Sequence, residues 1–136
     1  MDWITDDVAI GNYIEALDVE LLRCEKFASA LSLDGTLRDK DPADCGLRQI
    51  EVVPLEDAPG NEPRLFKLAV GYLSDLVLNA PPVLVQCHAG RSRSAVVVAG
   101  YLVSVLGMGP QEALDFVAAK RPIAVTPGLE RLLDYL

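Results

Sequence analysis

Residues 83–100 read VLVQCHAGRSRSAVVVAG, and this stretch decides the fold. The apolar run at residues 83–85 predicts a short strand that is buried on both faces. A loop of small and basic residues follows from Cys87 to Arg93, and the nearly all-apolar residues 94–106 predict a central helix. A buried strand that leads through a short loop into a helix is typical of α/β layer folds.

The rest of the chain continues this alternation of strands and helices. Further strands are predicted at residues 8–10, 27–33 and 50–55. Residues 34–46 and 57–61 are predicted to be loops, because they are rich in Asp, Gly and Pro. Helices are predicted at 15–25, 63–78, 111–120 and 128–136. We therefore predict one α/β domain that covers residues 1–136.

Composition limits the ligands that this domain can attract. The chain has 136 residues, of which 51% are hydrophobic, enough for a single core. Its 12 basic and 20 acidic residues give a net charge of −8, which repels nucleic acid and anionic membranes. Any anionic ligand must therefore be held by a local site.

The sequence also carries no sign of membrane insertion or export. No apolar run reaches the roughly 18 residues of a membrane span, and the N-terminus lacks the pattern of a signal peptide. We expect a cytoplasmic monomer with no nucleic-acid partner and no stable membrane association.

The three cysteines, Cys24, Cys45 and Cys87, are scattered along the chain. Without a C-x-x-C pair and with a single histidine, the sequence does not support a zinc site, and we expect neither a metal nor a cofactor. An odd number of cysteines argues against a disulfide framework.

The loop after the 83–85 strand has the properties of an anion site. The first N–H groups of a helix have no partners within the helix, and the helix dipole places positive charge behind them. Gly90 relieves crowding of the backbone around a bound anion. Arg93 follows Cys87 by six positions, so a curled loop would bring its guanidinium back beside the sulfur to grip phosphate oxygens.

The same positive field predicts a nucleophilic cysteine. It favours the thiolate of Cys87, which would attack phosphorus and form a phosphocysteine. A carboxyl group must then protonate the leaving oxygen and later activate water. Asp57, in a loop after a predicted strand, is the candidate, with Glu56 as its competitor. Ser94 is expected to donate a hydrogen bond to the departing thiolate.

The segment CHAGRSRS, Cys87 to Ser94, matches C-x-A-G-x-S-R-S, and the chain thereby resembles the dual-specificity phosphatases of the cysteine-based protein tyrosine phosphatase superfamily. Three other segments, ITDDVAIGNYIEALD, VVPLEDAPG and AAKRPIAVTPGLERLLDYL, also resemble that family. The resemblance implies a central, mainly parallel sheet of four to five strands flanked by helices. It also implies phosphomonoester hydrolysis without metal.

Residue roles follow from the resemblance position by position. Cys87 is then the nucleophile, Asp57 the general acid and base, and Ser94 the aid to thiolate departure. The phosphate would be bound by the Arg93 side chain and by main-chain amides, those of His88, Ala89, Gly90, Arg91, Ser92 and Arg93. The family usually has His before the cysteine where this chain has Gln86, and we expect activity to survive the difference.

Phosphotyrosine in proteins or peptides is the first substrate expected, and a shallow pocket would also admit phosphoserine and phosphothreonine. Residues 34–46 and 57–62 are the expected rims of that pocket. The second basic side chain of the loop, Arg91, raises the alternative of phospholipid, phosphoinositide or small phosphoester substrates. A phosphate-binding module without turnover and a sulfurtransferase are less favoured alternatives.

Overall fold

The computed structural model describes all 136 residues, and a five-stranded sheet forms its centre. The strands are β1 (Asp2–Trp3), β2 (Val8–Gly11), β3 (Ser29–Ser32), β4 (Gln49–Val52) and β5 (Val83–Gln86), in the spatial order β1-β2-β5-β3-β4. Only the β1–β2 pair is antiparallel. The mainly parallel sheet implied by the resemblance is therefore confirmed, and β5 is its central strand.

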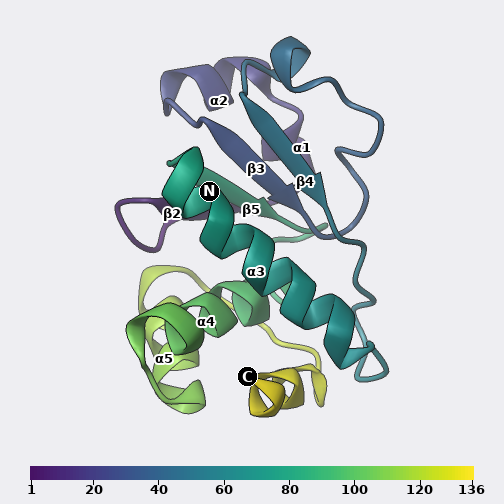
Figure 1. Cartoon of the computed structure of the whole chain (residues 1–136), viewed down its shortest axis with the longest axis vertical. Coiled ribbons are helices and arrows are strands. Elements are labelled where there is room, and N and C mark those ends of the chain that lie inside the picture. Colours follow the sequence, from purple (N-terminus) through teal and green to yellow (C-terminus); the bar gives the residue numbers. More distant parts are fainter.

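Helices cover both faces of the sheet (Figure 1). The larger core cluster joins one face to α3 (Pro63–Asn79), α4 (Arg93–Leu106), α5 (Pro110–Lys120) and the 3₁₀ helix η2 (Leu129–Tyr135). The smaller cluster joins the other face to α1 (Tyr13–Ala16), α2 (Val19–Cys24) and the 3₁₀ helix η1 (Pro42–Cys45). The molecule is thus a three-layer α/β structure.

The central position of β5 and α4 follows from their residues. Val83 and Val85 of β5 pack into the larger cluster, whereas Leu84 packs into the smaller one, as side-chain alternation along a strand requires. Every residue of α4 from Ser94 to Leu102 is buried. A Cβ on Gly100 would lie 2.8 Å from Val70 and 2.9 Å from Phe66, so a glycine here lets α4 approach α3 closely.

The predicted helix at residues 15–25 is wrong in one respect, because the structure divides this segment into α1 and α2. Asp18 interrupts it with an extended backbone (φ −87°, ψ 92°) and caps α2 by accepting a 3.1 Å hydrogen bond from the Leu21 N–H. An Asp in this position favours a new helix start over the continuation of a turn. Two further elements were not predicted, namely β1, which has two residues, and η1 inside the predicted loop 34–46.

The three cysteines are free and lie apart in the fold. Cys87 belongs to the larger core cluster and Cys45 to the smaller one, while Cys24 is exposed on α2. No helix combines the length and the apolar character needed to cross a membrane.

Candidate active site

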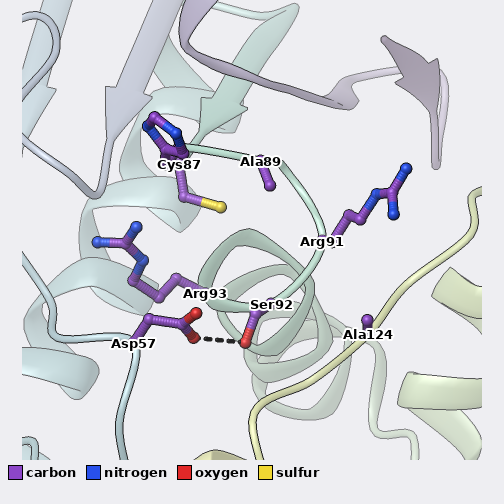
Figure 2. A pocket seen from close by; sticks show the side chains of 8 residues that line it. Asp57, Cys87, Ala89, Arg91, Ser92, Arg93 and Ala124 are labelled. Carbon is purple, nitrogen blue, oxygen red and sulfur yellow. Dashed lines mark hydrogen bonds between the residues drawn. The ribbon is translucent and has the colours of Figure 1, made fainter.

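A cavity of about 340 Å³ opens where β5 passes into α4 (Figure 2). It is lined by Asp57, Cys87, His88, Ala89, Arg91, Ser92, Arg93 and Ala124. The structure therefore brings together seven residues that the sequence singled out and adds Ala124. Gly90 and Ser94 are buried next to this lining and do not form part of it.

Cys87 follows β5 directly, and its sulfur points into the cavity, inside the curve of the loop (Figure 2). The loop turns carbonyl oxygens toward the protein. His88 O accepts from Tyr13 N at 3.1 Å, and Arg91 O accepts from Ala124 N at 3.0 Å. In contrast, no main-chain N–H of residues 88–92 donates a hydrogen bond within the protein. The loop thus keeps a run of amide donors available for an anion.

Gly90 and Arg121 determine the shape of the loop. Gly90 has φ +66°, and a Cβ there would lie 2.7 Å from Gly11 O and 2.8 Å from the Arg121 guanidinium. The buried Arg121 donates to Gly90 O at 2.7 Å and pairs with Asp2 at 2.7 Å. The loop is therefore fastened to the end of the β1–β2 hairpin at which Asp2 pairs with Ile10.

Arg93 lines the same cavity as Cys87, and a main-chain carbonyl holds its guanidinium. Its Nη1 donates to Leu55 O at 2.9 Å, whereas its buried Nε has no partner in the protein. The Ser94 hydroxyl, next along α4, is also buried without a partner. Arg91 lines the cavity, but its side chain is directed away from Cys87 (Figure 2).

Asp57 is fastened to the loop through one carboxylate oxygen. Its Oδ1 accepts from Ser92 Oγ at 2.7 Å (Figure 2) and from Thr126 Oγ1 at 2.8 Å. The Thr126 N–H in turn donates to Ser92 Oγ at 2.9 Å. Glu56, the alternative candidate for the general acid, is not part of the cavity lining.

Gln86, where the family usually has His, is wholly buried and fully hydrogen-bonded. Its Oε1 accepts from Ser32 Oγ at 2.7 Å, and its Nε2 donates to Asp34 at 2.8 Å and to Thr36 at 3.1 Å. An uncharged amide thus secures the strand end that carries Cys87.

The rim of the cavity differs in part from the expectation. Residues 34–46 contribute nothing to the lining, and Asp57 is the only contributor from residues 57–62. Instead, the Tyr13 ring stacks on the His88 ring at the cavity mouth, with centroids 4.5 Å apart and an interplanar angle of 5°. The reason is that α1, rather than the long loop, packs beside the cysteine loop.

Four contributors were missed by the sequence reasoning: Tyr13, Asp34, Arg121 and Thr126. Arg121 and Thr126 fall within the Arg-Pro segment whose resemblance to the family was noted, and that was the available signal. Tyr13 falls within the segment ITDDVAIGNYIEALD, which also resembles the family, whereas Asp34 has no local pattern that separates it from ordinary turn residues.

Comparisons with known proteins show the family of the chain. The model of the family "Dual specificity phosphatase, catalytic domain" matches residues 10–135. Mouse dual specificity protein phosphatase 15 is 32% identical over 130 residues, which cover 92% of this chain and 52% of that protein. Mouse dual specificity protein phosphatase 22 is 34% identical over 125 residues, covering 91% of this chain and 66% of that protein.

A solved structure shows the same architecture. The crystal structure of DUSP15 superposes with a TM-score of 0.84 at 27% identity, over 98% of this chain and 84% of that one. The chain belongs to the dual-specificity phosphatase family and carries its catalytic domain. It spans about half the length of the first curated relatives that it matches.

Proposed function

We propose that this protein hydrolyses phosphomonoesters of proteins or peptides through a phosphocysteine, with phosphotyrosine as the preferred substrate. The observation that carries the proposal is the set of donors around Cys87. The amides of residues 88–92 and the Nε of Arg93 have no acceptor in the protein. Cys87 shares one cavity with His88, Ala89, Arg91, Ser92 and Arg93. Such donors stabilise the charge that develops on phosphoryl oxygens during transfer.

In the first step the Cys87 thiolate attacks phosphorus, the P–S bond forms and the bond to the ester oxygen breaks. Asp57 donates a proton to the leaving oxygen. Because Oδ1 of Asp57 already accepts two hydroxyl hydrogen bonds, Oδ2 is the oxygen that carries this proton.

In the second step water attacks phosphorus and gives its proton to the Asp57 carboxylate. The P–S bond breaks, which releases inorganic phosphate and regenerates the thiolate. The Ser94 hydroxyl, which is buried without a partner, donates a hydrogen bond to the departing sulfur.

The test is phosphate release from a substrate panel that contains phosphotyrosine, phosphoserine and phosphothreonine peptides, a phosphoinositide and a small aryl phosphate. We expect the highest kcat/KM on phosphotyrosine peptides. Cys87→Ser should abolish turnover, and Asp57→Asn should reduce it roughly 10²- to 10⁴-fold by loss of acid–base catalysis. Glu56→Gln is the matched control and should retain the parental rate.

Other outcomes would replace this proposal. A higher kcat/KM on the lipid or the small ester would favour the alternative substrates. Binding of phosphopeptide without any phosphate release by the parent protein would indicate a non-catalytic module.

A further inference from the structure

Asp34 is hydrogen-bonded to Gln86, the residue before Cys87, and takes no part in the proposed hydrolysis. It follows β3 by two positions and is partly buried. Its Oδ1 accepts from Thr36 N at 2.9 Å and from Gln86 Nε2 at 2.8 Å. Its Oδ2 accepts from Thr36 Oγ1 at 2.8 Å. A carboxylate held by three hydrogen bonds has a fixed position in the fold.

That position is close to both active-site groups. Gln86, which binds Asp34, immediately precedes Cys87. On the other side, Leu33 O accepts from Leu55 N at 3.0 Å, and Leu55 O accepts from Arg93 Nη1 at 2.9 Å. Asp34 is thus connected to Cys87 through the side chain of Gln86. It is connected to the Arg93 guanidinium through the main chain of Leu33 and Leu55.

The Asp34 carboxyl is ionised at neutral pH. Burial by itself raises its pKa, but the hydrogen bonds from Thr36 and Gln86 and the positive charge of Arg93 outweigh burial and hold the pKa below its ordinary value. Asp34 and Arg93 form no contact ion pair. The orientation of the Arg93 guanidinium is therefore set by its hydrogen bond to Leu55 O. The charges of Asp34 and Arg93 attract each other without direct contact.

We propose that Asp34 is a positioning residue whose negative charge opposes a phosphate anion in the cavity, while its hydrogen bond to Gln86 holds the end of β5. A cradle of free amides and a guanidinium would otherwise retain the product, inorganic phosphate. A fixed negative charge behind the cradle weakens that affinity and hastens product release. The benefit to turnover rests on the proposed function, whereas the effect on phosphate affinity does not.

The test is calorimetric titration of inorganic phosphate into the parent protein and Asp34→Asn at low ionic strength. Asparagine keeps an oxygen acceptor for Gln86 and Thr36 and removes the charge. We expect the Kd for phosphate to fall roughly three- to tenfold, the size of a Coulomb term across a partly buried site. The difference should shrink at high salt.

Asp39→Asn is the matched control. Asp39 is an exposed carboxylate in the same loop with φ +64°, a conformation that asparagine tolerates. Its phosphate affinity should stay at the parental value. An Asp34→Asn protein with parental melting behaviour and equal or weaker phosphate affinity would overturn the proposal, since a purely structural role predicts no gain.

A folding defect and a failure of the proposed function can each be distinguished from a failure of this inference. If Asp34→Asn does not fold, Asp34→Ser, whose hydroxyl also accepts from the Thr36 N–H, carries the same expectation. Failure of both variants to fold would overturn the role as a counter-charge. Tighter phosphate binding by Asp34→Asn, with no turnover of any ester by the parent, would refute the proposed function alone. Turnover with an unchanged Kd would refute this inference alone.

Discussion

The Ser92 hydroxyl donates a 2.7 Å hydrogen bond to Asp57, which joins the cysteine loop to a carboxylate that lines the same cavity. Thr126 donates to the same oxygen at 2.8 Å, so three separate segments meet at one atom. The carboxylate is therefore fixed before a substrate arrives, and its other oxygen stays available for proton transfer.

Removal of these two hydroxyls should weaken acid catalysis. We expect the double variant Ser92→Ala/Thr126→Val to lose about 10- to 100-fold in kcat on alkyl phosphates, because a mobile acid protonates the leaving oxygen less effectively. The loss should be smaller on aryl phosphates with acidic phenols, which leave without full protonation. Steady-state rates across a series of leaving groups measure this. Ser104→Ala, on the exposed part of α4, is the control, and an equal loss on every ester would contradict the explanation.

The loop glycine should be intolerant of a side chain. Gly90→Ala combines φ +66° with a Cβ 2.7 Å from Gly11 O. We expect the free energy of unfolding to fall by about 1–3 kcal/mol or more, together with loss of activity, as measured by urea denaturation and phosphate release. Gly60→Ala, where an added Cβ meets nothing within 4 Å, should be neutral or slightly stabilising. Comparable stability of the two variants would show that the loop adapts.

Gln86 should contribute to stability through its hydrogen bonds. Gln86→Met retains most of the volume but removes the oxygen that accepts from the buried Ser32 hydroxyl at 2.7 Å and one of the three hydrogen bonds to the Asp34 carboxylate. Each unsatisfied buried group costs roughly 1–3 kcal/mol, so thermal denaturation should show a clear loss. Gln49→Met, at an exposed position of β4, should change little. A Gln86→Met protein as stable as its parent would mean that water replaces the amide.

The contribution of Glu15, at the start of α1, to the stability of the folded protein should depend on pH. Burial raises the pKa of Glu15, but the chain's amino group and the Asn12 N–H outweigh it and hold the pKa below its ordinary value of 4.5. A depressed pKa in the folded state contributes stability above the ordinary value and loses it as the pH falls through the folded value. The stability advantage of the parent over Glu15→Gln should therefore be constant near neutral pH and diminish below about pH 4.5. Denaturation curves between pH 7 and pH 3 measure it, and an advantage that grows toward acid would be inconsistent with this sign.

Much of the site could be predicted from the sequence because it is local. Cys87, Arg93 and the amides between them lie within one loop, so the strand and helix that flank it determine the curvature. Asp57 was found because it lies just past a predicted strand, and in a parallel sheet the carboxyl ends of the strands meet at one edge.

Other parts could not be predicted because they depend on tertiary contacts. The bond of Thr126 to Asp57 spans 69 residues, and that of Gln86 to Asp34 spans 52. Arg121 lies within a segment that resembles the family, but only the fold shows that its side chain contacts Gly90. The division of residues 15–25 into α1 and α2 has a local cause instead. The apolar spacing correctly predicted helical structure, but the helix cap at Asp18 was overlooked.

The stacked pair at the cavity mouth has a spectroscopic consequence. His88 is the single histidine of the chain, and its ring lies flat against Tyr13. Its imidazole proton resonances should be shifted upfield by the ring current and should form a resolved, one-residue reporter of ligand entry. The single tryptophan, Trp3, stacks on Phe27 and packs against the smaller core cluster. Its fluorescence should therefore report the packing of the β1–β2 hairpin and should not change when a ligand binds at Cys87.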